Sequence, residues 1–262
     1  MSLRNDSSVF IECPKLATAG PIGGDYNIQF GFTDGIPSKA FTDMNSLVSI
    51  TIPDGMTYID SRAFSGCSSL ENVIIPDSVT SIGAHAFSDC RSLMKIVIPD
   101  GVTSIKQNTF SGCSSLENVI IPDSVTSIGH ESFSGCSSLT SVTIPNDITS
   151  IEEKTFYGCS SLISVTIPNS VTSIEEETFY GCSSLISVTI PNSVTSIGAY
   201  AFSGCSSLNS MIIPDSVTSI GNSAFYGCNS LMDVVIGDNV PSLSSFYFPY
   251  YEQLKTVKIG RR

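Results

Sequence analysis

A unit of 23 residues repeats through most of this chain, and this period restricts the possible fold more than any other feature. Cysteine recurs at this interval eight times, from Cys67 to Cys228, and phenylalanine ten times, from Phe41 to Phe248. Leucine and proline follow the same interval. A period of this length is typical of proteins in which one small structural unit per repeat stacks on the next along an axis. We therefore predict an elongated solenoid and not a globular enzyme core.

Each repeat holds three short apolar runs that no single repeat can bury. In the repeat at residues 70–92, the first run has strand-forming residues and ends at Pro76, which has no N–H for strand pairing. The last run has the spacing of one helical turn. The three runs are Leu70, Val73 and Ile75; Val79 and Ile82; and Ala86, Phe87 and Cys90. We expect a three-sided coil whose strands pair in parallel with those of its neighbours.

The motif IPDSVTSIGxxAFSGCSSLxxV resembles the BspA-like leucine-rich repeat family of bacterial and protist surface proteins. The match covers residues from about 36 to 260. The resemblance implies a right-handed solenoid of the α/β horseshoe class, dominated by β-structure. It implies a parallel sheet on the concave face, with short turns or one-turn helices on the other sides. It also implies adhesion, or binding to host proteins, other cells or matrix.

The two ends of the chain depart from the repeat, so we divide the chain into a cap and a solenoid. Residues 1–35 are expected to form an irregular N-terminal cap, with a strand at Tyr26–Phe30. Residues 36–262 are expected to form about ten repeats. The last repeat, about 240–262, is expected to act as the C-terminal cap, with the aromatic residues of 246–251 closing the core. A binding site at these aromatic residues is the alternative.

Charge and hydropathy exclude several classes of partner. The net charge is −12, whereas nucleic acid and anionic lipid surfaces require a basic face. No apolar stretch is long enough to insert into a membrane. The start of the sequence shows no signal peptide. The resemblance favours an extracellular or cell-surface protein whose export signal has been removed; a cytoplasmic protein is the alternative.

The cysteine column has three interpretations. Each cysteine shares a face with alanine and phenylalanine, which predicts a small buried hydrophobic side chain, reduced and inaccessible. Disulfides between neighbouring coils are a second interpretation, although stacked side chains point in parallel. Zinc is a third, but no Cys-x-x-Cys pair is present. Cys13 lies outside the column and is the expected reactive thiol.

Outward-facing columns are where we expect a ligand. The residue between the two inward positions of each strand is apolar in two blocks, which flank a block of three threonines. The column after the leucine adds further apolar residues. Exposed apolar surface on a sheet predicts protein binding. The alternative is that valine, isoleucine and threonine occur here only because they have a high propensity for strands. The candidate residues are Ile74, Met94, Val97, Ile120, Ile163, Ile186, Ile212, Met232 and Val235.

Other repeated polar columns have a structural interpretation beside a functional one. A column of aspartates after the strand suits a turn, and calcium binding is the alternative. A threonine ladder suits backbone hydrogen bonding, and glycan binding is the alternative. Glu152–Glu153 stack on Glu175–Glu177, where a solvated face or a basic partner is expected.

No nucleophile–base pair or phosphate-binding loop is apparent, so we expect no enzyme and no cofactor. The predicted function is non-catalytic protein binding or adhesion, with a partner such as a host matrix, cell-surface or other-cell protein. An intracellular protein-interaction scaffold and a cation- or glycan-binding repeat wall are the alternatives.

Overall fold

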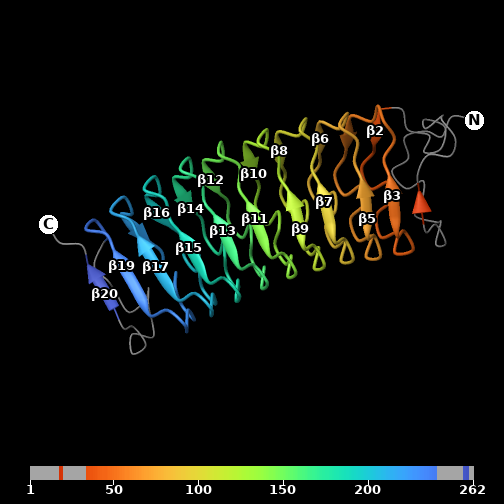
Figure 1. The fold of residues 1–262 in the computed structure, drawn as a ribbon. Helices are drawn as coiled ribbons and strands as arrows, with labels where there is room; N and C mark the ends of the chain where they lie inside the picture. The colour runs from red at the N-terminus through yellow and green to blue at the C-terminus, as the bar shows by residue number, and fades with distance from the viewer. Residues whose placement is uncertain (1–17, 20–33, 241–255, 260–262) are drawn as a thin grey trace, which may run out of the picture.

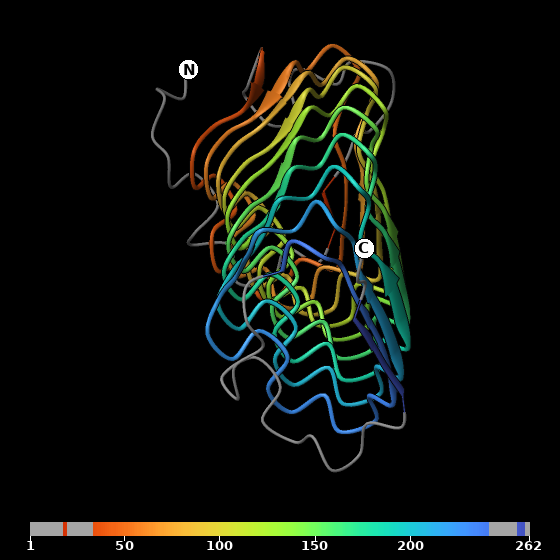
Figure 2. The ribbon, with the colours of Figure 1, turned by 90° about the vertical axis from the view of Figure 1, so that its left-hand side faces the viewer.

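The computed structural model describes residues 18–19, 34–240 and 256–259, and the repeats in this part form a stack of coils (Figure 1). A coil is counted here from each repeat leucine to the residue before the next one, for example residues 139–161. Viewed along the stack, successive coils lie one behind another around a shared interior (Figure 2). The parallel solenoid predicted from the 23-residue period is confirmed.

The first side of the stack is a parallel sheet, the long-strand sheet, to which each described coil adds one strand. Equivalent residues pair in register, so that Val142 lies beside Val165 and Thr143 beside Thr166. This register follows from the repeat, because it places every apolar residue next to its copy in the adjacent coil. The strands are β1 (Thr18–Ala19), β3 (Ser49–Thr51), β5 (Asn72–Ile74), β7 (Lys95–Val97), β9 (Asn118–Ile120), β11 (Ser141–Thr143), β13 (Ser164–Thr166), β15 (Ser187–Thr189), β17 (Ser210–Ile213), β19 (Asp233–Ile236) and β20 (Thr256–Ile259).

The second side is built from strands of two residues, each formed by a serine and the isoleucine of the second apolar run in most coils. These strands also pair in parallel and in register, as Ser173 with Ser196 and Ile174 with Ile197. The short strands are β2 (Gly35–Ile36), β4 (Tyr58–Ile59), β6 (Ser81–Ile82), β8 (Ser104–Ile105), β10 (Ser127–Ile128), β12 (Ser150–Ile151), β14 (Ser173–Ile174), β16 (Ser196–Ile197) and β18 (Ser219–Ile220).

The third side, the turn side, contains turns, and the helical turn expected from the third apolar run does not form. The N–H of Ala86 donates to the carbonyl of Gly83 within its own coil (3.2 Å), whereas the N–H of Phe87 donates to Thr109 of the next coil (2.9 Å). Among the described residues there is no helix. Two residues of this coil, His85 and Asp89, have a positive φ, a left-handed conformation that interrupts a right-handed helix.

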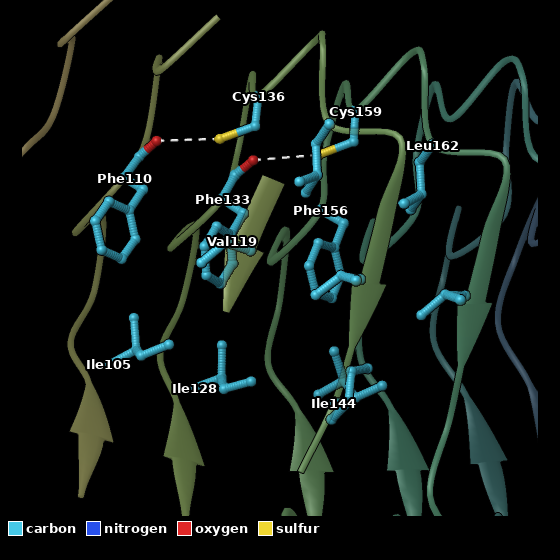
Figure 3. Close-up of a cluster of buried hydrophobic side chains, with 14 of the residues drawn as sticks. Ile105, Phe110, Val119, Ile128, Phe133, Cys136, Ile144, Phe156, Cys159 and Leu162 are labelled. Atoms are coloured by element: carbon cyan, nitrogen blue, oxygen red, sulfur yellow. Dashed lines mark hydrogen bonds between the residues drawn. The ribbon is translucent and has the colours of Figure 1, made fainter. Parts of the chain in front are cut away.

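The core is a set of side-chain columns that run along the stack. The phenylalanine rings from Phe41 to Phe225 stack with centroids 5.0 to 5.7 Å apart. In Figure 3, the thiol of Cys136 donates to the carbonyl of Phe110 (3.2 Å), and Cys159 repeats this contact with Phe133 (3.2 Å). The cysteine column therefore fills space and also satisfies a buried carbonyl in the coil before it.

Hydrogen bonding along both sheets is interrupted at the same two steps of the stack. The first break lies between coils 70–92 and 93–115, where neither β5 and β7 nor β6 and β8 are paired. The second lies between coils 116–138 and 139–161, where β9 and β11, and β10 and β12, are unpaired. The 23-residue period alone did not indicate either break.

The beginning of the solenoid agrees with the predicted phase, since Ile36, Phe41 and Met44 are buried. The strand expected at Tyr26–Phe30 and the aromatic cluster of 246–251 lie outside the described residues.

Candidate functional site: the long-strand face

The long-strand face is the outward surface of the long-strand sheet. Side chains alternate across a strand, so the inward residues of β13 and its neighbours leave the residues on either side facing solvent. Val165 in the centre of β13 is buried, and Ser164 and Thr166 beside it are exposed. The first and third positions of each three-residue strand therefore form two columns on this face.

Eight of the nine candidate residues are exposed large hydrophobic side chains. The most exposed are Ile74 at 61 %, Ile212 at 60 % and Ile120 at 58 %, values unusual for isoleucine in a folded protein. Met232 differs, because it is half-buried. The exposed residues are Ile74, Met94, Val97, Ile120, Ile163, Ile186, Ile212 and Val235.

Strand pairing places these side chains side by side. Val97 lies directly beside Ile120, and Ile212 lies beside Val235. Between these two blocks the same column reads Thr143, Thr166 and Thr189, again in register. The long-strand face therefore presents two apolar blocks separated by a strip of hydroxyl groups.

The long-strand face carries little charge for a protein with a net charge of −12. Within strands β3 to β19, the only charged residues are Lys95 and Asp233. Exposed Glu71 and Glu117 occupy the position of Met94 in the coils before and after it, so acidic groups flank the apolar surface there. Burying the apolar groups is the main contribution that the strands themselves can make to binding.

Charged residues gather at the edge between the short strands and the turn side. Lys154 lies between two acidic groups, with its Nζ 3.0 Å from Glu153 and 3.9 Å from Glu177. These contacts lower the pKa of Glu153, first through the hydrogen bond from Lys154. His130 lies 3.4 Å from Glu131. The stacked glutamates are therefore partly neutralised by Lys154.

The cysteine column offers no reactive group. All eight column cysteines are buried and free of disulfides. Burial raises the pKa of the Cys67, Cys159 and Cys228 thiols to about 12 and raises the pKa of the other five as well. A thiol that stays protonated and buried is neither a nucleophile nor a metal ligand at neutral pH. Cys13 lies outside the described residues.

Side chains of the repeated polar columns form hydrogen bonds with backbone groups of the adjacent coil. The hydroxyl of Thr195 donates to the carbonyl of Thr172 (3.2 Å), and Thr218 repeats this contact with Thr195 (3.3 Å). Asp215 accepts a hydrogen bond from the N–H of Asp238 in the next coil (2.8 Å). Among the described residues, no three His, Cys, Asp or Glu side chains converge as metal ligands would.

Sequence reasoning missed a shallow groove of ≈ 430 Å³ on the short-strand side, between the two breaks in the sheets. Gly129 lies on its floor, with Lys106 in the coil before and Glu152 in the coil after. The sequence does contain a sign of this groove: the repeat position of Gly129 is glycine in some coils and a larger residue in others.

A model of the BspA type leucine rich repeat region matches residues 34–163 and 149–262 of the chain. No curated protein matches the chain. Among solved structures, a leucine rich cell surface protein from Faecalibacterium prausnitzii is 26 % identical, with a TM-score of 0.48 and coverage of 94 % of this chain and 88 % of that chain.

Two further solved structures are similar to this chain. The Treponema pallidum leucine rich repeat protein is 28 % identical, with a TM-score of 0.49, covering 74 % of this chain and 78 % of its own. The pneumococcal vaccine antigen PcpA is 20 % identical, with a TM-score of 0.52, covering 95 % of this chain and 76 % of its own. The likeness to PcpA supports the solenoid fold. No helix in the described part of the chain is long and apolar enough to cross a membrane.

Proposed function

Because the chain belongs to the BspA-type leucine-rich repeat family, we propose that it is a non-catalytic protein-binding module of a surface or secreted protein, and that it acts in adhesion. The proposed binding surface is the long-strand face. Its partner is a protein of a host matrix, a host cell surface or another cell.

The observation that carries this proposal is the pair of apolar blocks on the long-strand face. Ile74, Val97 and Ile120 are each more than half exposed, and Met94, which directly precedes β7, is exposed as well. Covering such side chains contributes on the order of 25 cal/mol for each Å² of apolar area removed from water. Monomeric soluble proteins seldom expose contiguous apolar surface without a binding function.

The first step of the test is to capture and identify a partner from a matrix or cell-surface extract with the wild-type protein. The second step is to measure the affinity of that partner for the triple variant Ile74→Lys, Val97→Lys and Ile120→Lys. Three buried ammonium groups would oppose binding, so we expect a loss of affinity of about a hundredfold or more. Circular dichroism must show that the variant keeps the wild-type fold.

A matched control carries the same added charge on another side of the same region. Thr103, Thr126 and Thr149 are exposed beside the short strands, and the triple substitution of these residues by lysine should leave the affinity nearly unchanged. If the folded long-strand variant binds as tightly as the wild type, the long-strand face is not the binding surface. If both variants lose affinity equally, net charge and not the apolar block controls binding.

A further inference from the structure

The two breaks in the sheets do not extend to the turn side, which stays hydrogen-bonded through both. Across the first break, the N–H groups of His85, Phe87 and Asp89 still donate to carbonyls of the next coil at 3.1, 2.9 and 2.7 Å. Across the second, Glu131, Phe133 and Gly135 do the same at 3.1, 3.0 and 2.7 Å. The first break therefore opens both sheets and leaves the turn side closed. At the second break one bond also remains beside the long strands, from the N–H of Thr140 to the carbonyl of Glu117 (3.4 Å).

Four kinds of contact are lost at the breaks. At intact steps, the threonine before each short strand donates its N–H and its hydroxyl to the threonine of the preceding coil, as Thr172 does to Thr149 at 2.9 and 3.3 Å. In the described part of the chain, Thr103 and Thr149 make neither bond to the coil before them. The ladders of the long strands and of the short strands are also missing there.

One position in the repeat accounts for both breaks. The corner position is the residue that follows each short strand, and its N–H donates to the preceding coil, as Gly198 does to Ile174 at 2.7 Å. Among the described corner residues that have an N–H, only Lys106 and Glu152 lack this bond. Among the described corner residues, these are the two steps at which a residue with a side chain follows a glycine. A third such step in the sequence, from Gly221 to Ser244, ends outside the described residues, and its long strands β17 and β19 are paired. The corner residues are Pro37, Asp60, Gly83, Lys106, Gly129, Glu152, Glu175, Gly198 and Gly221.

Close packing at the corner position explains why the bond is lost when a residue with a side chain follows a glycine. A Cβ added at Gly198 would lie 2.5 Å from the backbone of Glu175, and one at Gly129 would lie 2.8 Å from the nitrogen of Gln107. A residue with a side chain therefore cannot take the backbone position that glycine takes. Glu175 follows another glutamate and keeps its bond, although at 3.2 Å it is longer than the glycine bonds.

Side-chain hydrogen bonds confirm that the two kinds of corner have different backbones. The hydroxyls of Thr109, Thr155 and Thr178 donate to the carbonyl of the corner residue of their own coil at 2.7 to 2.8 Å. Ser132 occupies the same place in a glycine coil, yet its buried hydroxyl has no partner. A step from a glycine corner to a corner with a side chain therefore joins two coils that do not match.

The mismatch also loosens the packing. Val73, Ile75 and Ile121 lie on the coils before the two breaks and are only partly buried, whereas Ile98 and Ile144 are buried. The groove around Gly129 extends across both breaks, from Ala84 before the first to Glu152 after the second. Regions with few backbone hydrogen bonds and looser packing open at lower free energy than the rest of a fold.

We propose that the two breaks are joints, and that the coil pair 93–138 rocks between them about the hydrogen-bonded turn side. This pair carries Met94, Val97 and Ile120, so the joints let these residues change their position relative to Ile74 on one side and to the threonine strip on the other. The joints themselves follow from the corner residues. Their use in binding rests on the proposed function of the long-strand face.

Amide hydrogen exchange of the free protein tests the joints without any partner. The amides of Thr103 and Thr149 should exchange about tenfold faster or more than those of Thr172 and Thr195, their copies at intact steps. Equal exchange rates at these four positions would overturn the proposal.

Substitutions at the corner position give a sharper test, because they should erase one joint and move the other. Lys106→Gly makes the first step a glycine-to-glycine step, so Thr103 should become as protected as Thr195. Glu152→Gly closes the second joint and creates a new mismatch before Glu175, so protection should appear at Thr149 and disappear at Thr172. The matched control Glu175→Gly changes the same position where the bond already exists, and Thr172 should stay protected.

The outcome is decided by the exchange pattern of these three variants. A joint that moves by one coil in Glu152→Gly supports the proposal, and a joint that stays at Thr149 overturns it. The binding measurements test the long-strand face, and the exchange measurements test the joints. Failure of the proposed function and failure of the joints are therefore distinguishable.

Discussion

The inward and outward side chains of the same long strands differ in how strongly the neighbouring coils constrain them. In β13, Val165 is 6 % exposed and lies between its copies Val142 and Val188, whereas Thr166 faces solvent. An inward side chain is fixed by contact with the coils on both sides, so its column hardly changes along the stack. An outward side chain has no such constraint, and its column changes from isoleucine to threonine and back. The inward columns therefore determine the fold, and the outward columns are free to determine what the protein binds.

The largest expected effect is a loss of stability at high pH, caused by the inward-facing cysteine thiols. Burial holds the column thiols protonated, with the pKa of Cys159 raised to about 12 from 9.0. Above pH 9 the thiols of the unfolded chain ionise while the folded ones do not, so stability is complete below pH 9 and falls as the pH rises toward 12. In this window each buried thiol lowers the free energy of unfolding by roughly 1 kcal/mol for each pH unit.

Urea unfolding under reducing conditions at pH 8 and pH 10 measures this loss. Eight thiols titrate together, so the decrease should exceed that of any single substitution. Cys136→Ala removes one of them and should make the free energy of unfolding less dependent on pH. An unchanged pH dependence in this variant would show that other groups cause the loss.

The second expected effect compares one inward with one outward residue. Phe156 is fully buried in the phenylalanine stack, and Phe156→Ala should lower the free energy of unfolding by roughly 3–5 kcal/mol. Thr166→Ala changes an exposed residue and should cost about 0.5 kcal/mol or less. Chemical denaturation of the two variants provides the comparison. Similar stabilities would mean that the assignment of inward and outward positions is wrong.

The smallest expected effect compares two inward residues of one column. The hydroxyl of Ser132 is buried without a partner, so Ser132→Ala should stabilise the protein by about 1 kcal/mol. The hydroxyl of Thr178 donates to the carbonyl of Glu175 at 2.8 Å, so Thr178→Ala should destabilise it by about 1 kcal/mol. Thermal melts should shift in opposite directions. A destabilised Ser132→Ala would mean that its hydroxyl has a partner in solution.

The 23-residue period was sufficient to predict the parallel solenoid, the buried columns and the exposed apolar blocks, because each depends on contacts that every repeat makes alike. For the turn side the family resemblance implied short turns or one-turn helices, and turns form; the helical turn expected from the residue spacing does not. The spacing of Ala86, Phe87 and Cys90 fits a helix, but the left-handed conformation of His85 does not show in the identity of the residue.

Met232 was included among the exposed residues and is half-buried, a difference that the repeat pattern does not contain. The breaks in the sheets also escaped prediction, because they depend on the order of glycine and other residues at the corner position. A repeat analysis averages over that order, whereas packing between two particular coils responds to it.

Site-specific photo-crosslinking tests most directly whether a protein partner binds the long-strand face. A photoreactive residue is placed at Ile120 on the long-strand face or at Thr126 of the same coil beside the short strands, both exposed. If the partner binds the long-strand face, position 120 gives a covalent adduct with the captured partner and position 126 gives none. An adduct from position 126 and none from position 120 would contradict this proposal.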